Sequence, residues 1–466
     1  MSFRTTQSKS PFVRRIALAL SAVLVAAACT PLLAQQPVPF SARYHDNAVK
    51  SPTKLVTVPG TLVIPASSRT NAADKGKRAH TNFRYIVPVG SSPADIPAYG
   101  YGYETPASLA CIYQLVTPVA GCNPNAVTAV PNGGGGTIAI VDAYHDPAAY
   151  GDLAYFSDEF GIPLKPSMFQ VVFASGSEPP VDSTGGWEME EALDIEYAHA
   201  MAPNAMLYLV EANSNSNEDL FAAVTVATNL VICGNKTCPK GGNGKGEVSM
   251  SWGGEEAAGQ LNFDKTLKAV SNVVYFASSG DSAGVIYPST SPYVVAVGGT
   301  STARSLATGN LLSEITWSEG GGGLSSFETA PAYQSGITAI NQGARSVPDI
   351  SADANPNTGA WVYDSFPSDG YYYSSNWWWV GGTSLASPMI AGIVNASEAK
   401  SGKWATSTTA ELTALYSLLA VANKTAYGND FNDITYGACN YYSGSFAVTG
   451  YDLCTGIGSP KGLAGK

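Results

Sequence analysis

The chain has 466 residues, of which 45% are hydrophobic and 13% are charged, and it carries a formal net charge of −11. This composition predicts a globular protein with one large core or two modest ones. The acidic balance argues against nucleic acid as a partner, because nucleic-acid binding depends on basic patches that displace counterions.

Residues 1–34 have the pattern of a secretory signal peptide. Basic residues open the segment, an apolar run from Ile16 to Ala28 follows, and small residues come after it. The run is short for a membrane span, and no later stretch is apolar enough to cross a bilayer. We expect cleavage near Ala34, a secreted or periplasmic protein, and no stable membrane association. A lipid anchor at Cys29 is the alternative, although Ala26 stands where such anchors usually have leucine.

Residues 35–100 mix short strand-like runs with polar breaks that contain proline and glycine. We interpret this stretch as an N-terminal extension or short pro-segment that lies outside the main core. The character of the sequence changes at "GGGGTIAIVDAY", where long apolar runs begin.

Six cysteines remain once the signal peptide is removed, and they fall in the sequence as neighbours. In a secreted chain this spacing favours three local disulfides, although other pairings stay open. A zinc site at "CGNKTC" is an alternative, but no second half with histidines or cysteines is visible. The expected pairs are Cys111 with Cys122, Cys233 with Cys238, and Cys439 with Cys454.

Near-continuous apolar runs predict strands that are buried on both faces. Helix-like segments separate several of them, including residues 188–202 and 385–400. Strands that alternate with helices indicate an α/β fold with a mainly parallel central sheet and helices on both faces. The apolar runs are residues 137–142, "AMLYLVEA", "VSMSW", "NVVYFASSG" and "YVVAVGG".

The stretch "GGTSLASP" places Ser384 between a predicted strand and a predicted helix. The amide N–H of a serine at the start of a helix is free to bind an oxyanion, and the helix dipole adds to that field. Gly-Thr-Ser with Pro388 four residues after the serine resembles the motif of subtilisin-like peptidases, and a capping serine is the alternative. A subtilisin also needs a histidine base, and none of the four histidines has the required neighbours: His45, His80, His145 and His199.

Glu190 and Asp194 are four residues apart, so both lie on one face of the predicted helix. Apolar residues continue that face, which predicts that the two carboxylates point toward protein. Two like charges in a poorly solvated place cannot both ionise easily, so a proton tends to be shared. A solvated acidic face is the alternative, and it is our prediction for Glu188 and Glu191.

Further motifs follow one another in a single order, and together they resemble one family. The chain is similar to the sedolisins, serine-carboxyl peptidases that share the subtilisin fold and replace its histidine with glutamate. The resemblance covers residues 100–460 and implies a catalytic domain over residues 101–466. The motifs are "EEALDIEYAHAMAPNA", "VSMSWGGEE", "FASSGDSAG", "YPSTSPYVVAVGGT", "EITWSEGGGGLSSF", "PAYQ", "RSVPDISADANPNTG", "GGTSLASP" and "NDITYG…GYDLCTGIGSP".

The resemblance implies a role for each of four polar residues. Ser384 would be the nucleophile, Glu190 its general base, and Asp194 the partner that orients Glu190. Asp281 matches the oxyanion aspartic acid of the family, with a turn residue as the alternative. A carboxylate would repel the developing oxyanion, whereas a protonated carboxyl donates a hydrogen bond to it, so we expect activity in acid. Asp142 is expected to be structural or to support the site.

The C-terminal region resembles the calcium site of the same family. The implied ligands are the carboxylates of Asp433 and Asp452 and the backbone carbonyls of Ile434, Val448 and Gly450. Calcium binds six or more hard oxygens, which carboxylates and loop carbonyls supply. The family usually has glycine where Val448 stands, and a carbonyl ligand tolerates that change if the backbone angles allow it.

The sequence therefore predicts a secreted monomer that hydrolyses peptide bonds of polypeptides in acid, with Ca²⁺ as its cofactor. Ser249–Gly253 resembles the segment that pairs with substrate backbone in this fold, which implies that the substrate binds there as an extended strand. Three alternatives stay open: a tripeptidyl aminopeptidase in place of an endopeptidase, a neutral hydrolase that uses His145 or His199, and a catalytically silent secreted binding protein on the same fold.

Overall fold

The computed structural model describes residues 60–88, 103–116, 131–233, 244–268, 270–305, 311–366, 376–420, 424–439 and 445–465. The predicted signal peptide and Cys29 lie outside these residues. Within the described part of the chain, no helix is both long enough and apolar enough to cross a membrane.

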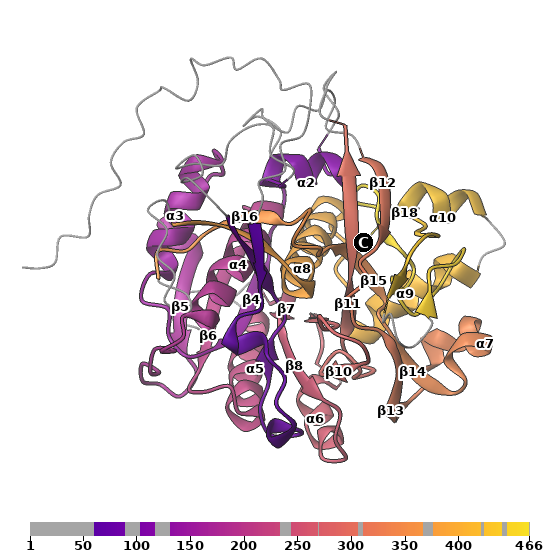
Figure 1. Ribbon diagram of the computed structural model, residues 1–466, viewed down its shortest axis with the longest axis horizontal. Helices are drawn as coiled ribbons and strands as arrows, with labels where there is room; N and C mark the ends of the chain where they lie inside the picture. Colours follow the sequence, from indigo (N-terminus) through magenta and orange to yellow (C-terminus); the bar gives the residue numbers. More distant parts are fainter. Residues whose placement is uncertain are drawn as a thin grey trace, which may run out of the picture. The chain divides into compact units, whose positions relative to one another are not determined.

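A mainly parallel sheet of eight strands forms the centre of the fold (Figure 1). Its neighbouring strands run parallel, except that β12 is antiparallel to β11. The predicted α/β class is confirmed, and each of the five apolar runs contributes a strand to this sheet. In order, the strands are β12 (Leu311–Thr316), β11 (Val295–Arg304), β9 (Val273–Ser278), β7 (Gly246–Met250), β4 (Thr137–Ala143), β6 (Met206–Ala212) and β5 (Phe169–Phe173), with β15 (Ile350–Asp353) also beside β11.

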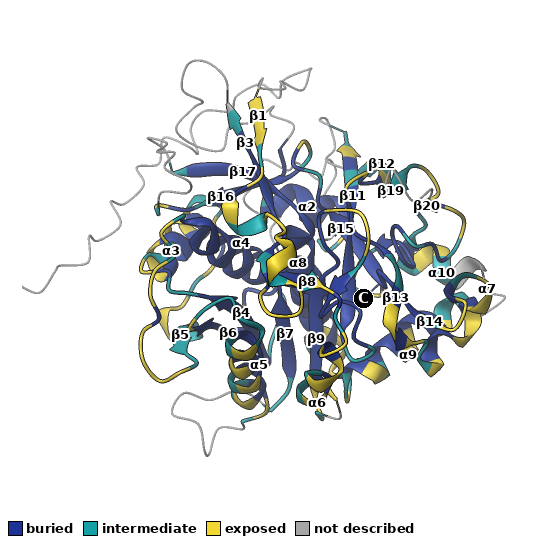
Figure 2. Ribbon diagram, turned by 60° about the horizontal axis from the view of Figure 1, so that its bottom comes forward, coloured by how far each residue is buried: buried dark blue, intermediate teal, exposed yellow. Residues whose placement is uncertain are grey.

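Helices cover both faces of this sheet. Side chains alternate along β4, so that Ile138 and Ile140 pack with residues of α4 while Ala139 and Val141 pack with residues of α5. Helix α8 lies beside α4 and packs on β7, β9, β11 and β15. Figure 2 shows α4 buried along its length, whereas α5 has an exposed outer side. The helices are α3 (Ala149–Glu159), α4 (Gly186–Met201), α5 (Asn217–Ile232) and α8 (Thr383–Ser401).

Residues 60–88 belong to the folded body, so the expectation that the extension lies outside the main core is wrong for this part of it. Phe83 and Tyr85 are buried in a large hydrophobic cluster, and Tyr85 meets Trp378 edge-on with ring centroids 5.3 Å apart. The sequence does not predict this packing, because the strands of this segment are short and contain few apolar residues. A four-stranded sheet holds the segment, in the order β1 (Gly60–Val63), β3 (Arg84–Pro88), β17 (Trp377–Gly381) and β16 (Ala360–Tyr363).

A second short strand of this segment pairs elsewhere. Strand β2 (His80–Thr81) is antiparallel to β8 (Trp252–Glu255), which continues from β7, and β10 (Ile286–Tyr287) lies on the other side of β8. Residues 60–88 are therefore attached both to the hairpin of β16 and β17 and to the loop region that follows β7.

The remaining elements surround the core. The helices are α2 (Pro106–Ile112), α6 (Asp264–Leu267), α7 (Thr338–Asn341), α9 (Thr408–Ala420) and α10 (Lys424–Asp430). The strands are β13 (Gly323–Thr329), β14 (Ala344–Val347), β18 (Phe431–Asn432), β19 (Ala438–Cys439), β20 (Ser445–Phe446) and β21 (Ser459–Pro460).

One predicted disulfide, Cys439 to Cys454, is confirmed. Cys111 and Cys233 are also disulfide-bonded. Their predicted partners, Cys122 and Cys238, lie outside the described residues, so those two pairings stay predictions.

Candidate active site

Ser384 lies in the first turn of α8, after the turn that Gly381 and Gly382 make at the end of β17. Gly382 has a φ of 139°, which glycine adopts far more readily than other residues. The Ser384 hydroxyl donates a hydrogen bond to the carbonyl oxygen of Ser251 at 3.0 Å. Its backbone N–H, which a helix leaves unpaired in the first turn, donates to the carbonyl oxygen of Asn82 at 3.0 Å. Ser384 thus already holds a peptide carbonyl through its amide.

Glu190 and Asp194 lie one turn apart on α4, which packs against α8 (Figure 1). Both side chains are fully buried. Burial raises the pKa of Glu190 well above its usual range, Asp194 and Asp142 raise it further, and Ser384 lowers it. Burial also raises the pKa of Asp194, and Ser251 and Glu190 lower it. The structure therefore brings the predicted base next to the predicted nucleophile.

A third carboxyl, Asp142, belongs to the same buried group. It is fully buried in β4, and its pKa is raised well above the usual range by burial and then by Asp194 and Glu211. Asp142 lies near the carboxyl end of a central parallel strand. Functional sites of open α/β sheets lie at these strand ends, so this position in the sequence marked Asp142 as a candidate site residue. Because little water reaches these carboxyls, they cannot all be ionised at the same time, and they share protons.

Asp281 follows β9 and is held by the residue before Ser384. Its Oδ1 accepts hydrogen bonds from the backbone N–H and the hydroxyl of Thr383, both at 2.8 Å. Its Oδ2 is buried and has no hydrogen-bond partner among the described residues. Burial raises the pKa of Asp281 to about 7, although Thr383 and Arg84 lower it. The carboxyl is therefore protonated in acidic solution and has a hydrogen to donate.

Asp281 lies near the peptide group that Ser384 binds. A Cβ added to Gly382 would collide both with the carbonyl oxygen of Asn82 and with Oδ2 of Asp281. These two oxygens therefore lie close together on one side of Gly382. The carbonyl oxygen that accepts the N–H of Ser384 and the oxygen of Asp281 that a proton would turn into a donor are thus near the same side of Gly382.

Asn82 is a site residue that the sequence analysis missed. Its backbone N–H donates to Oγ of Ser384 at 3.1 Å, across 302 residues of chain. The side chain is 1% exposed. No motif marks Asn82, and only the short alternation of "HTNFRYIVP" between polar and apolar residues hinted that this stretch is a strand.

The remaining acidic residues near the start of α4 are also buried, and the prediction that Glu188 and Glu191 form a solvated face is wrong. Both side chains are fully buried, because α3, α8 and the sheet together surround α4. Glu188 accepts a hydrogen bond from the backbone N–H of Asp182 at 2.7 Å, and burial raises the pKa of Glu188 to about 8.

Neither of the two histidines that could have served as a base bonds to Ser384 among the described residues. His145 Nδ1 lies 2.8 Å from Oε2 of Glu211, and burial lowers the pKa of His199 to about 4. Among the described residues, the hydroxyl of Ser384 bonds to Ser251 and Asn82 and to neither histidine. This arrangement gives no support to a histidine base.

The predicted calcium ligands gather near the C-terminus. Both carboxylate oxygens of Asp433 accept the backbone N–H of Gly450, at 3.0 and 3.2 Å. Oδ2 of Asp452 accepts the N–H of Val448 at 3.2 Å. The carbonyl oxygens of Ile434, Val448 and Gly450 accept no hydrogen bond from a described residue.

This donor set fits a hard cation. It consists of oxygens alone, with two carboxylates and three backbone carbonyls that are available for coordination. Within the described ranges, no group of three or more histidine, cysteine, aspartate or glutamate side chains could hold a metal ion. A cation at this loop would therefore depend on backbone carbonyls for most of its ligands.

Comparison with known proteins identifies relatives of the chain. No protein-family model matches it. Kumamolisin from Bacillus sp. (strain MN-32) is 30% identical over 367 residues, a match that covers 71% of this chain and 59% of kumamolisin. Sedolisin from Pseudomonas sp. (strain 101) is 27% identical over 310 residues, which covers 59% of this chain and 47% of sedolisin. The chain thus spans about half the length of these relatives.

A solved structure shows the same fold. Pseudomonas sedolisin, a serine-carboxyl proteinase complexed with two molecules of pseudo-iodotyrostatin, superposes with a TM-score of 0.60 at 24% sequence identity. The match covers 77% of this chain and 95% of that one. It confirms the predicted subtilisin-like fold.

Proposed function

The chain belongs to the sedolisin family, and from this premise we propose that it is a secreted serine-carboxyl peptidase that hydrolyses polypeptides in acid. One observation carries the proposal: the N–H of Ser384 binds a peptide carbonyl oxygen, and the unpartnered Oδ2 of Asp281 lies on the same side of Gly382 as that oxygen. An oxyanion hole requires donors that lie near one oxygen. Secretion rests on the signal-peptide pattern of residues 1–34.

In this proposal Ser384 attacks the carbonyl carbon of the substrate while Glu190 takes the proton of its hydroxyl. A hydroxyl has one hydrogen, so this transfer requires the hydrogen to leave the carbonyl of Ser251. The negative oxygen that develops receives hydrogen bonds from the N–H of Ser384 and from protonated Asp281. Glu190 then passes the proton to the leaving amine, and water hydrolyses the ester.

The buried carboxyls explain why acid suits this chemistry. Asp281 donates only when it is protonated, and its pKa of about 7 keeps it so in acid. Glu190 must lose its proton to act as a base; its raised pKa disfavours that loss in acid but makes the ionised form a stronger acceptor. Asp194 and Asp142 hold neighbouring protons and orient Glu190.

An internal segment supports endopeptidase action over tripeptidyl cleavage. Residues 80–88 pass Ser384 as part of a longer chain, with β2 before Asn82 and β3 after it. More than three residues precede the carbonyl that Ser384 holds. A tripeptidyl enzyme has to exclude the fourth residue before the cleaved bond, whereas this segment continues through β2.

Hydrolysis of a denatured protein between about pH 2 and pH 8 tests the proposed function. We expect the rate to be highest in acid and to fall as the pH rises through about 7, where Asp281 loses its proton. A rate that rises toward neutrality would instead support a hydrolase with a histidine base. Absence of hydrolysis at every pH would support a binding protein on the same fold.

We also propose that Ca²⁺ binds at the loop of Asp433 and Asp452, with the carbonyls of Ile434, Val448 and Gly450 as further ligands. Bound calcium stabilises only the folded state, so excess chelator is expected to lower the melting temperature by several degrees. Differential scanning calorimetry with and without chelator measures this shift. In the double variant Asp433→Asn, Asp452→Asn the shift should disappear, and an unchanged melting temperature in the parent protein would contradict the site.

A further inference from the structure

The buried carboxyls of the active site continue onto a neighbouring strand of the central sheet. Asp142 on β4 and Glu211 on β6 are register partners in two adjacent parallel strands, and both side chains are fully buried. Both belong to the face that α4 covers, because Ile140 and Leu209, two residues earlier, pack with residues of α4. Strand β4 lies between β6 and β7, and the helix of Ser384 packs on β7. Glu211 therefore extends the carboxyl group away from the nucleophile.

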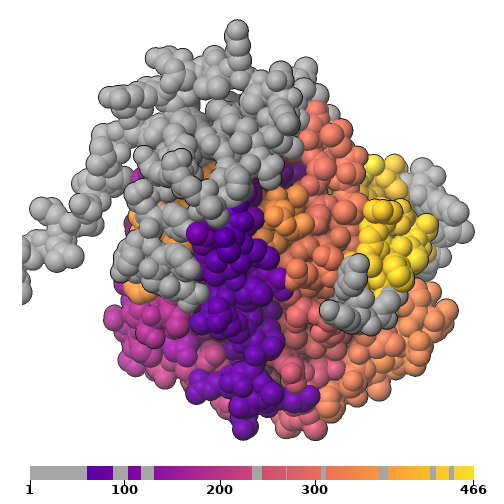
Figure 3. Space-filling view, viewed as in Figure 1, coloured from indigo at the N-terminus to yellow at the C-terminus, as the bar shows by residue number. Residues whose placement is uncertain are grey.

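A histidine contacts the outer end of this group. His145 Nδ1 lies 2.8 Å from Oε2 and 3.0 Å from Oε1 of Glu211. The side chain of His145 is 14% exposed, whereas that of Glu211 is fully buried. At the other end, residues 60–88 cross one face of the molecule as a continuous indigo band in Figure 3, and Asn82 of this band bonds to Ser384. His145 therefore links the buried group to solvent at the end away from Ser384.

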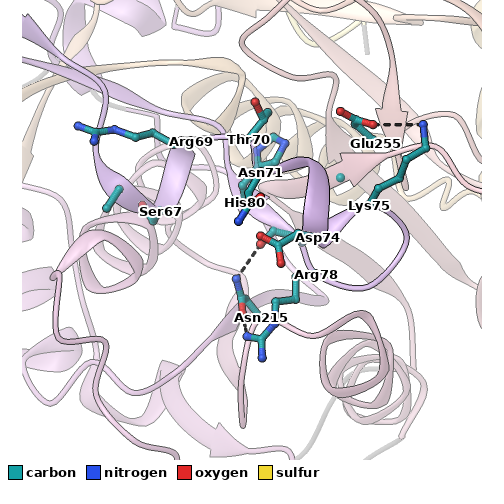
Figure 4. A pocket seen from close by; sticks show the side chains of 13 residues that line it. Ser67, Arg69, Thr70, Asn71, Asp74, Lys75, Arg78, His80, Asn215 and Glu255 are labelled. Carbon is teal, nitrogen blue, oxygen red and sulfur yellow. Dashed lines mark hydrogen bonds and ion pairs between the residues drawn. The ribbon is translucent and has the colours of Figure 1, made fainter.

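The loops around His145 hold it in this position. The residue before it, Tyr144, has a φ of 76°, which few residues other than glycine adopt. The N–H of His145 donates to the carbonyl oxygen of Pro180 at 3.2 Å. The hydroxyl of Tyr144 donates to Oδ1 of Asn215 at 3.2 Å, and Arg78 donates to the same oxygen at 2.8 Å, as Figure 4 shows. The loops that follow β4, β5 and β6 thus fix the imidazole beside its carboxyl partner.

His145 is a basic residue in surroundings that are otherwise acidic. Among the described residues, it is the one basic side chain that forms an ion pair with a buried carboxyl of α4, β4 or β6. The positive charge that faces this group therefore comes from His145. The titratable groups around the pair of His145 and Glu211 come from each neighbouring element: Asp142 on β4, Asp146 after it, Glu178 and Asp182 after β5, and Glu188 and Glu191 on α4.

Protons bind to the pair in two steps. Burial raises the pKa of Glu211 to about 9. Burial lowers the pKa of His145 from its usual value, and Glu178 partly offsets this effect. At neutral pH the pair therefore holds one proton and is neutral overall. In acid it binds a second proton and carries a net positive charge. This charge thus appears under the conditions in which the peptidase is proposed to work.

We propose that the pair of His145 and Glu211 compensates the charge of the catalytic base, so that in acid its positive charge stabilises ionised Glu190. The inference rests on the proposed function. A buried carboxylate among other carboxyls ionises with difficulty, and a cation at the edge of the group reduces that cost. The effect passes through Asp142, which lies between the pair and Glu190. His145 does not bond to Ser384 among the described residues, so it is a positioning residue and not the base.

The first experiment measures kcat for one synthetic peptide across the acidic range, for the parent protein and for His145→Gln. The parent rate should fall toward low pH as Glu190 gains its proton. In His145→Gln this fall is expected at a pH about half a unit higher, because ionised Glu190 has lost a stabilising charge. At a fixed pH below the midpoint, kcat is then about threefold lower, with KM unchanged. A melting curve shows that each variant is folded.

Three further variants separate the charge of His145 from its contact with Glu211. His145→Lys keeps a positive charge and should return the fall to the parent pH. Glu211→Gln places an uncharged amide where acid leaves an uncharged carboxyl, so this variant should also resemble the parent. Lys165→Gln is the control, since it removes an exposed positive charge that forms no ion pair with a described residue. Equal shifts in His145→Gln and Glu211→Gln would mean that only the contact matters, and would overturn the inference.

A second measurement does not depend on the folding of these variants. Nuclear magnetic resonance of labelled histidine in Ser384→Ala, which should not digest itself, follows the protonation of His145. The inference requires a charged imidazole throughout the pH range in which the parent enzyme is active, and a neutral imidazole there would overturn it. In the kinetic experiment, a parent protein that is active in acid, with an unshifted fall in His145→Gln, would overturn the inference and leave the proposed function standing. Absence of hydrolysis by the parent would overturn both.

Discussion

Ser384→Ala is expected to lower kcat/KM for peptide hydrolysis by about 10⁴- to 10⁶-fold, with little change in folding. The substitution removes the atom that attacks the carbonyl carbon, and the residual rate would come from the backbone N–H of residue 384 and from Asp281. Among the described residues, the side chain loses its hydrogen bonds with Ser251 and Asn82 and its interaction with Glu190. Steady-state kinetics on one synthetic peptide, beside a melting curve, measures both effects.

Ser401→Ala is a matched control for this experiment. Ser401 ends the same helix, is exposed, and donates only to neighbouring carbonyls of Glu398 and Lys403. Its loss should leave the rate within about twofold, since exposed substitutions away from a site change little. If Ser384→Ala kept a tenth or more of the parent rate, roughly three to five orders of magnitude above the expectation, Ser384 would not be the nucleophile.

Glu190→Gln is expected to lower kcat by about 10²- to 10⁴-fold, the usual contribution of general acid–base catalysis. Glutamine has nearly the shape of glutamate, so packing on α4 is preserved, but an amide cannot take the hydroxyl proton. KM should change little, because Glu190 does not hold the substrate backbone. Kinetics at several acidic pH values would separate a lost base from a shifted pH optimum.

Glu191→Gln provides the comparison on the adjacent residue. Glu191 is equally buried, and its pKa is raised by burial and by Glu211 and Asp146. This variant should keep most of its activity. Equal losses in Glu190→Gln and Glu191→Gln would mean that the whole buried acidic group matters only for folding.

The central sheet and its two main helices could be predicted because each depends on a long local pattern. Apolar runs of five or more residues gave five of the eight strands, and the spacing of Glu190 and Asp194 placed both on one face of α4. The order of motifs then placed Asp281 and Ser384 in one site, and in the structure Asp281 accepts two hydrogen bonds from Thr383, the residue before Ser384.

Features that depend on distant contacts could not be predicted in the same way. Glu188 and Glu191 look solvated in a single helix, and they are buried because other elements surround that helix on all sides. Asn82 lies in a stretch with little local pattern, and its role comes from a contact with Ser384 far along the chain. The roles of the four polar residues and the calcium ligands stay predictions that the proposed variants would test.

The dependence of kcat/KM on pH, for the parent protein and for Asp281→Asn, tests most directly whether a protonated carboxyl serves the oxyanion. Asparagine keeps the Oδ1 acceptor for Thr383 and places an amide donor, which does not titrate, where Oδ2 lies. The parent rate should fall as the pH rises through about 7, because Asp281 loses its hydrogen there. The variant should stay active in acid and show no such fall. A variant rate that falls at the same pH as the parent rate would contradict the account.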